Sequence, residues 1–313
     1  MNNLLLKGVV AAAMLAASPV LAEFPSDDRV TIVVPYSAGG GFDTIVRTFA
    51  PAVEIALGTT VIPENVPGAS GTRGGQAVSR AAADGYTIGI YNIPGLNVAE
   101  LVGRDLGFDL ASVTWIANLA QSNYAIAVAG DSPIQSVQDL CNLGRPIKLS
   151  DTGTNSTSSI TSVIAFDILG CPIVNVTGYG GSNDTMIAVL RGEVDATLKP
   201  ISSLARYTDT GDLRLIATLT EETVAEGVQN AVELGHPELA QFGLSRAIGG
   251  PADMPAEIVA ILSAAFRTAA ESEDVIMWAE STGTELNWLS PEDTTAMMAD
   301  ISEFYLQYQD LLK

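Results

Sequence analysis

Apolar segments of two kinds alternate along this chain. Short runs of apolar and β-branched residues predict strands, and longer segments with apolar residues at helical spacing predict helices. The strands are expected at 30–34, 60–64, 87–91, 113–119, 124–129, 148–150, 173–176, 196–198 and 215–218. The helices are expected at 43–56, 74–82, 136–141, 158–169 and 182–191, with a terminal group of amphipathic helices from residue 256. Strands that alternate with helices are typical of parallel sheets covered on both faces, so the pattern predicts an α/β protein.

Two of the predicted strands run into turns of unusual composition. The strand at 30–34 is followed by three consecutive glycines, and the strand at 148–150 is followed by a run of Ser, Thr and Asn. Each turn then leads into a helix. A chain of 313 residues suits one large domain or two medium ones. Because each turn opens its own series of strands and helices, we expect two α/β lobes.

The glycine turn, Gly39 to Gly41, has the geometry of a small-anion site. Glycines let the backbone approach a ligand closely, and the helix that follows offers unpaired N–H groups in its first turn. Similar turns bind nucleotides, and many bind nothing. A P-loop would need Gly-Lys-Ser/Thr where Phe42, Asp43 and Thr44 stand, and the Rossmann fingerprint needs spaced glycines. Asp43 would also repel a pyrophosphate unless its side chain pointed away, so a small anion is favoured.

The second turn offers side-chain donors as well. Seven of the eight residues from Thr152 to Ser159 are Ser, Thr or Asn. Hydroxyls, an amide and the N–H groups at a helix start can bind a carboxylate. An ordinary N-capping loop is the alternative, but capping needs only one of those hydroxyls. Two such turns on two lobes would suit a ligand with a carboxylate at each end.

The first 22 residues have the pattern of a secretory signal peptide. Lys7 precedes an apolar segment at 8–17, and the small residues that end at Ala22 suit signal peptidase. A membrane anchor would need roughly 18 or more apolar residues, and no cysteine follows the cleavage site to carry a lipid. We expect cleavage after Ala22 and an exported, soluble mature protein.

Acidic residues far outnumber basic ones. The chain has 36 Asp and Glu against 15 Lys and Arg, a formal net charge of −21 at pH 7. This charge argues against nucleic acids and anionic membrane surfaces as partners. It also means that any anion site must work through local donors. The acidity itself is typical of a solvated surface.

The chain has two cysteines and one histidine. In an oxidising compartment, Cys141 and Cys171 are expected to form a disulfide, and two buried thiols are the alternative. His236 stands in a Gly-His-Pro turn, which suits neither a metal site nor a Ser-His triad and disfavours a secreted hydrolase. We therefore expect no metal, no cofactor and no enzymatic activity.

Six motifs, in order along the chain, resemble those of one family. They occupy 34–43, 64–71 with 83–87, 152–156, 178–182, 190–195, and 242–255. The first reads Val-Pro-Tyr-Ser-Ala-Gly-Gly-Gly-Phe-Asp, and the second reads Glu-Asn-Val-Pro-Gly-Ala-Ser-Gly. The combination is similar to that of the receptors of tripartite tricarboxylate transporters, the Bug-type periplasmic binding proteins.

The resemblance implies a clamshell like the type II periplasmic binding proteins. Lobe 1 would comprise residues 23–124 and 240–313, and lobe 2 residues 125–239, each with a mostly parallel sheet flanked by helices. The implied function is that of a periplasmic receptor, monomeric and without cofactors, which captures a small carboxylate between the lobes and delivers it to integral membrane permease subunits. An alternative is a receptor that presents the ligand to a membrane sensor kinase, which the sequence does not separate from transport.

The resemblance also implies ligand contacts, carried over by position. These are Tyr36, Ser37, Ala38, Gly39, Gly41 and Asp43 around the first turn, Asn92 after the strand at 87–91, and Thr152, Thr154, Asn155 and Ser156 in the second turn. Tyr36 replaces the commoner phenylalanine and could pack on the ligand or in the core.

The chain departs from the family pattern in two places. Residues 155–159 read Asn-Ser-Thr-Ser-Ser where the family usually has Gly-Thr-Pro-Ser-His. Lys199 follows the strand at 196–198, where the family often has aspartate or another small polar residue. Lys199 would add a cation for the ligand, or it would point into solvent at the end of its strand. Neither departure identifies the ligand.

Overall fold

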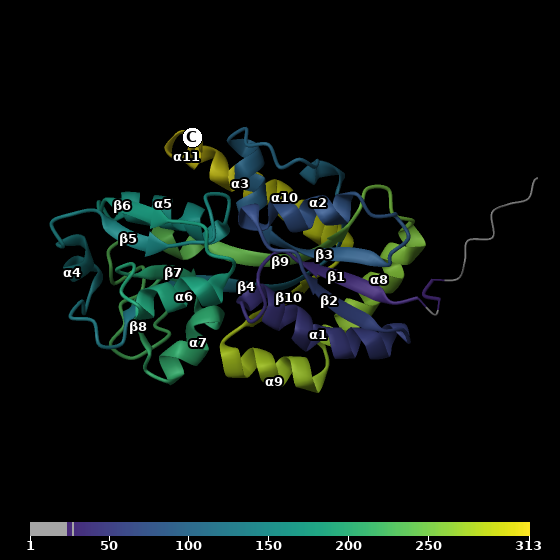
Figure 1. Ribbon diagram of the computed structural model, residues 1–313, viewed down its shortest axis with the longest axis horizontal. Helices are drawn as coiled ribbons and strands as arrows, with labels where there is room; N and C mark the ends of the chain where they lie inside the picture. The colour runs from purple at the N-terminus through teal and green to yellow at the C-terminus, as the bar shows by residue number, and fades with distance from the viewer. Residues whose placement is uncertain (1–23, 27) are drawn as a thin grey trace, which may run out of the picture.

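The computed structural model describes residues 24–26 and 28–313, and the predicted signal peptide lies outside them. Two lobes lie side by side, each built of strands flanked by helices (Figure 1). None of the helices in the described part of the chain has the length and apolar character that a bilayer span requires. The predicted α/β class and two-lobe architecture are confirmed.

Strands and helices alternate over most of the chain. The strands are β1 (Val30–Val34), β2 (Val61–Asn65), β3 (Thr87–Ile93), β4 (Thr114–Ala129), β5 (Ile147–Ser150), β6 (Ile173–Val176), β7 (Thr197–Pro200), β8 (Leu213–Thr218), β9 (Gly243–Gly250) and β10 (Glu285–Leu289). The α-helices are α1 (Gly41–Leu57), α2 (Thr72–Ser79), α3 (Gly95–Leu101), α4 (Val137–Cys141), α5 (Thr157–Ile168), α6 (Ser182–Leu190), α7 (Ile201–Asp209), α8 (Ala256–Ala270), α9 (Glu273–Thr282), α10 (Pro291–Tyr305) and α11 (Gln309–Leu312). Short 3₁₀ helices lie at Ala69–Gly71, Leu110–Ser112, Pro237–Gln241 and Leu306–Tyr308. The sequence pattern did not predict α3, α7, β9 or β10.

The sheet of lobe 1 has the strand order β10-β4-β9-β3-β1-β2. β1 pairs in parallel with β2 and β3, whereas β9 runs antiparallel to both β3 and β4, and β10 runs antiparallel to β4. The sheet is therefore mixed, not mostly parallel. The reason is that β9 brings the chain back from lobe 2, so it enters between β3 and β4 in the opposite direction.

One strand, β4, passes from lobe 1 into lobe 2. The pattern predicts two strands here, at 113–119 and 124–129, because polar residues interrupt two apolar runs. That prediction is wrong, since a single strand covers Thr114–Ala129. Up to Asn123 it pairs with β9, and from Tyr124 onward with β7 and β8. The polar residues 121–123 are accommodated because they line a hollow beside α10 and do not enter either core.

Lobe 2 is built around the second half of β4. β7 and β8 flank this part of β4 in antiparallel pairing, and β5 pairs in parallel with β6. An isolated bridge from Leu149 to Ala196 connects β5 to the segment that precedes β7. Cys141, at the end of α4, and Cys171, beyond α5, form a disulfide with Cα atoms 5.2 Å apart. The predicted disulfide is confirmed.

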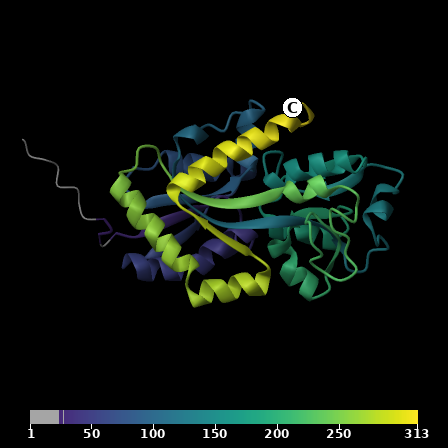
Figure 2. The same ribbon diagram turned by 180° about the vertical axis from the view of Figure 1, so that it is seen from behind.

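Helices cover the sheet of lobe 1 on both faces. α1, α8 and α9 lie on one face, and α2, α3 and α10 on the other (Figure 1). Figure 2 shows α10 and α11 running back across the molecule, and α11 contacts α5 of lobe 2. The C-terminal segment thus touches both lobes. The lobe boundaries expected at 124/125 and 239/240 stay a prediction.

Candidate functional site

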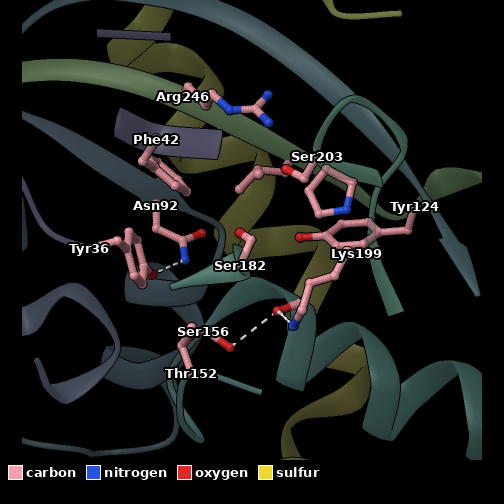
Figure 3. A pocket seen from close by; sticks show the side chains of 13 residues that line it. Tyr36, Phe42, Asn92, Tyr124, Thr152, Ser156, Ser182, Lys199, Ser203 and Arg246 are labelled. Atoms are coloured by element: carbon pink, nitrogen blue, oxygen red, sulfur yellow. Dashed lines mark hydrogen bonds between the residues drawn. The ribbon is translucent and has the colours of Figure 1, made fainter. Parts of the chain in front are cut away.

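A cavity lies between the two lobes, beside the point where β4 passes from one to the other (Figure 3). It has about 370 Å³ of space not filled by atoms, part of it open to solvent. Lobe 1 and β4 contribute Tyr36, Phe42, Asn92, Tyr124, Leu244 and Arg246, and lobe 2 contributes Thr152, Ser156, Ser158, Ser182, Lys199, Pro200 and Ser203. The result is one polar site with an aromatic wall, built by both lobes.

The wall that lobe 1 provides is held by hydrogen bonds. Tyr36, directly after β1, donates to the Ser70 carbonyl (2.9 Å) and accepts from the Asn92 amide on β3. The Tyr36 ring packs against Phe42, with centroids 4.9 Å apart. Asn92 in turn accepts from the Thr157 hydroxyl of lobe 2. Burial raises the pKa of Tyr36, so its hydroxyl stays neutral.

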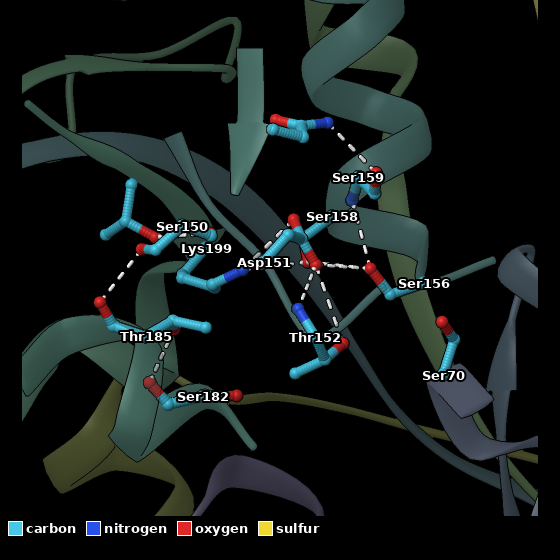
Figure 4. A network of polar contacts seen from close by, with 12 residues as sticks. Ser70, Ser150, Asp151, Thr152, Ser156, Ser158, Ser159, Ser182, Thr185 and Lys199 are labelled. Atoms are coloured by element: carbon cyan, nitrogen blue, oxygen red, sulfur yellow. Dashed lines mark hydrogen bonds and ion pairs between the residues drawn. The ribbon is translucent and has the colours of Figure 1, made fainter. Parts of the chain in front are cut away.

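Lys199 is buried in lobe 2, so the alternative in which it points into solvent is wrong. It lies on β7 and is 1% exposed. Its Nζ is 3.2 Å from Asp151 Oδ2 and 3.0 Å from Ser158 Oγ (Figure 4). Burial lowers the pKa of Lys199, and the Asp151 carboxylate acts in the opposite direction. Lys199 therefore belongs to a buried ion pair at the cavity.

Asp151 directly follows β5 and organises the second turn. Its Oδ1 accepts from the Thr152 N–H (2.7 Å), the Ser158 hydroxyl (3.0 Å) and the Ser156 hydroxyl (Figure 4). The Ser156 hydroxyl also accepts from the Ser159 N–H and so caps α5. Several polar groups of this turn therefore hold an internal carboxylate, a role that the sequence did not reveal.

The glycine turn lies where the lobes touch. Ser37 donates its backbone N–H to the Gly180 carbonyl (3.0 Å) and its hydroxyl to Asp184 (3.2 Å), both in lobe 2. Gly39 donates its backbone N–H to the Asp43 carboxylate (2.8 Å). The backbone N–H groups of Gly39 in this turn and of Ser37 just before it are thus already bonded within the protein.

Asp43 is directed into lobe 1. Its carboxylate accepts from Gly39, from Arg47 (2.9 Å) and from the Asn65 amide (2.9 Å). Burial opposes the ionisation of Asp43, but these hydrogen bonds outweigh it and lower the pKa of the carboxyl. Asp43 therefore shapes the turn, and Arg47 compensates its charge.

Two residues of the second turn lie at the rim of the site. Arg104 of lobe 1 donates to the Thr154 carbonyl (2.9 Å) and to the Asn155 side-chain oxygen (2.8 Å). The backbone N–H of Asn155 also donates to the Ser70 hydroxyl of lobe 1 (3.3 Å). These contacts hold the lobes together beside the cavity.

The structure brings five of the twelve predicted ligand contacts together in the cavity wall. They are Tyr36, Asn92, Thr152, Ser156 and Lys199. The other seven lie at the lobe contact, at the rim or within lobe 1: Ser37, Ala38, Gly39, Gly41, Asp43, Thr154 and Asn155. Their contact with a ligand stays a prediction.

Sequence reasoning missed the remaining lining residues. They are Phe42, Tyr124, Ser158, Ser182, Pro200, Ser203, Leu244 and Arg246. Most are hydroxyl or apolar residues without a distinctive pattern. Arg246 alone had a usable signal, because it is the single charged residue in the strand Gly243–Gly250.

Arg246 is 2% exposed and lies on β9. It donates to the Ser122 hydroxyl (2.8 Å) and the Ser202 hydroxyl (3.3 Å), and its guanidinium carbon lies 5.7 Å from the centroid of the Phe42 ring. Burial lowers the pKa of Arg246 to about 10, so the side chain is still charged at neutral pH. The cavity therefore contains a second buried cation.

Comparison with known proteins identifies the family. The model of the tripartite tricarboxylate transporter family receptor matches residues 45–304. The chain belongs to this family. A UPF0065 protein of Bordetella bronchiseptica is 28% identical to this receptor over 277 residues, which cover 87% of the receptor and 82% of the relative.

Solved structures share the fold of this receptor. The periplasmic binding protein BugD matches it with a TM-score of 0.85 at 22% identity, over 91% of this chain and 98% of its own. An R. palustris protein solved with adipate matches with a TM-score of 0.84 at 24% identity, over 93% and 98% of the two chains. The family is one of transporter receptors, and BugD is a periplasmic binding protein, not an enzyme, which confirms the prediction of a solute-binding receptor without enzymatic activity.

Proposed function

We propose that this receptor captures a small carboxylate between its lobes and delivers it to the membrane permease of a tripartite tricarboxylate transporter. The observation that carries the proposal is the cavity, where two buried cations, Lys199 and Arg246, and several hydroxyls face a shared space. Charged and hydroxyl donors bind carboxylates through short, charge-assisted hydrogen bonds. The adipate bound to the R. palustris neighbour supports the same class of ligand.

Direct hydrogen bonds between the lobes support capture by closure. Ser37 donates to the Gly180 carbonyl, and the Gly95 N–H donates to the Thr157 hydroxyl (2.8 Å). Such bonds require the lobes to be together. A ligand that touches both walls favours the closed form, because it gains contacts there that an open form lacks.

Thermal unfolding and calorimetry test the binding. Purified residues 23–313 are screened against mono-, di- and tricarboxylates, each beside its amide or alcohol analogue. We expect at least one carboxylate to raise the melting temperature, because a ligand that binds only the folded state stabilises it. The uncharged analogue should leave the melting temperature unchanged. A screen in which no carboxylate produces a shift would contradict the proposal.

Delivery to a permease is tested in cells. A strain that lacks this receptor should lose uptake of the labelled carboxylate found in the screen, and should regain it when the gene is restored. A sensing role predicts the opposite pattern, in which uptake continues and the transcriptional response to the ligand disappears.

A further inference from the structure

Arg246 is a buried cation with no acidic partner. It forms no ion pair with any residue that the structure describes. Ser122 and Ser202 accept from its terminal nitrogens, and its Nε has no hydrogen-bond partner among the described residues. A guanidinium has five N–H donors, and burying its charge unpaired is costly. Arg246 therefore keeps both donors and charge for a group that enters the cavity.

The other buried cation is already balanced. Lys199 and Asp151 form a pair in which both side chains are almost fully buried. Asp43, the buried acid of the first turn, has Arg47 as its partner. Asp184, at the lobe contact, is only partly buried, so solvent screens its charge. Lys199 and Asp151 cancel, and the buried groups at the cavity carry the single positive charge of Arg246.

We propose that the ligand of this receptor is a monocarboxylate that pairs with Arg246 and turns a neutral polar group toward Lys199. The inference rests on the proposed function, because it names the kind of carboxylate that the cavity selects. A second carboxylate on the ligand would lie beside the Asp151 carboxylate. Asp151 would repel it, and Asp151 already neutralises the charge of Lys199. This differs from the sequence-based expectation of a ligand with a carboxylate at each end.

The two cations enter the cavity from different strands, so they can contact different parts of a ligand. Arg246 pairs with Ala120 and Lys199 pairs with Ala125, so their backbones are five residues apart along β4. The Arg246 guanidinium reaches along β4 to Ser122, so the two charged groups are closer together than their backbones. Figure 3 shows Tyr124 between the two cations, with its hydroxyl directed into the cavity. The aromatic and apolar residues that line the same cavity, among them Phe42 and Leu244, suit a hydrocarbon body.

Lys199 keeps one donor for a neutral group. An ammonium has three N–H donors, and Asp151 and Ser158 accept two of them. The third can meet a hydroxyl, keto or amide oxygen of the ligand without any added charge. Burial raises the pKa of Tyr124 well above its usual value, so its hydroxyl is a further neutral donor.

Matched ligand pairs test the preferred charge. 4-Hydroxybutyrate with succinate, and 6-hydroxyhexanoate with adipate, differ by one charge at the same chain length. Calorimetry is expected to show that the hydroxy acid of at least one pair binds at least tenfold more tightly than its diacid. Hydroxy acids that bind no more tightly than their diacids overturn the inference and leave the proposed function standing. If another carboxylate emerges from the wider screen, its singly and doubly charged forms are compared in the same way.

Substitution of Arg246 tests the counter-charge. Arg246→Met should reduce the affinity for the bound monocarboxylate at least thirtyfold, while the melting temperature of the unliganded protein is unchanged or higher because an unpaired buried charge is gone. If the methionine variant does not fold, Arg246→Gln is used in its place. It keeps hydrogen-bonding capacity without the charge, and the same loss of affinity is expected. Arg214→Met is the matched control, because the side chain of Arg214 bonds only to the Ser132 and Ile134 carbonyls of lobe 2 among the described residues. Unchanged affinity in a folded Arg246 variant overturns the inference.

Asp151→Asn provides the converse test. The amide oxygen can still accept from the second turn, but Lys199 loses its counter-charge. A second carboxylate is then no longer repelled by Asp151 and can itself serve as the counter-ion of Lys199, so the preference should move at least tenfold toward the diacid. If a folded Asp151→Asn protein keeps the wild-type preference for the monocarboxylate, the charge balance of the cavity is not what selects the ligand, and the inference is overturned.

Discussion

At the scale of single residues, pairing decides what each charged side chain of the cavity can do. Lys199 and Arg246 are both buried cations in the wall of one cavity. Lys199 has the Asp151 carboxylate 3.2 Å away, whereas Arg246 donates only to hydroxyls among the described residues. Two side chains of equal charge and similar burial therefore have different capacities to bind an anion.

Lys199→Met tests the buried pair. Methionine keeps most of the volume of the stem but leaves Asp151 as a buried carboxylate without a cation, which should lower the free energy of unfolding by about 3 to 5 kcal/mol. Urea unfolding at pH 7 measures this loss. The affinity for the carboxylate should fall about ten- to a hundredfold, the equivalent of one charge-assisted hydrogen bond. Lys199→Met/Asp151→Asn should recover most of the stability, and a single variant as stable as the wild type would contradict the pair.

At the scale of elements, the glycine turn determines how closely α1 approaches lobe 2. α1 begins at Gly41, where a Cβ atom would lie 2.5 Å from Ser203 Oγ of α7. A Cβ at Gly40 would lie 3.5 Å from the backbone nitrogen of Ser182. A side chain at Gly41 would therefore displace the Ser203 hydroxyl at a point where the two lobes meet, in addition to any effect on the approach of a ligand to the backbone.

Gly41→Val should abolish measurable ligand binding and leave the fold intact. The β-branched side chain would push Ser203 and the guanidinium of Arg246 away from α1 when the lobes are closed, and its stiff χ1 torsion leaves few ways to relieve that contact. Calorimetry measures the affinity, while circular dichroism and the melting temperature check the fold. Gly41→Val/Ser203→Gly should recover part of the affinity. Gly243→Ala is the control, since a Cβ there meets the Ser122 carbonyl at 3.7 Å. Wild-type affinity in a folded Gly41→Val protein would show that this turn does not contribute to closure of the lobes.

At the scale of the whole molecule, one continuous strand, the returning chain and a few polar contacts connect the lobes. β4 runs from lobe 1 into lobe 2, the chain returns to lobe 1 ahead of β9, and α11 contacts α5 of lobe 2. Arg104 links three segments, because it donates to Thr154 and Asn155 of lobe 2 and to the Leu312 carbonyl near the C-terminus (3.1 Å). We therefore expect closure to depend on contacts outside the cavity as well as on the ligand.

Arg104→Ala should weaken ligand binding about tenfold, because hydrogen bonds to charged groups contribute about 1.5 to 3 kcal/mol and these ones need the closed form. Small-angle scattering should show that the ligand makes the wild-type protein more compact, and that the variant needs more ligand for the same change. Arg80→Ala, which removes an exposed arginine, is the control. An Arg104→Ala protein that closes at the wild-type ligand concentration would contradict this role.

The sequence by itself determined the features that local patterns encode. Alternating apolar runs and helical periodicity were enough to predict the α/β class and most elements up to β8. The repeat of a strand and the repeat of a helix can each be recognised within a few residues. The two cysteines and the export pattern were enough for the disulfide. Motifs in order along the chain indicated the family, and they located both turns that flank the cavity.

Tertiary structure alone decided the features that depend on distant residues. β4 is one strand because β9, β7 and β8 pair with its two halves, which no local pattern shows. Lys199 is paired because a carboxylate 48 residues away lies beside it. Arg246 is a cation of the cavity because β9 places it next to Ser122, 124 residues earlier, with no acid among the described residues in reach. The net charge at a binding site is the sum over the charged groups that lie close together in space, and the order of residues along the chain does not show which groups those are.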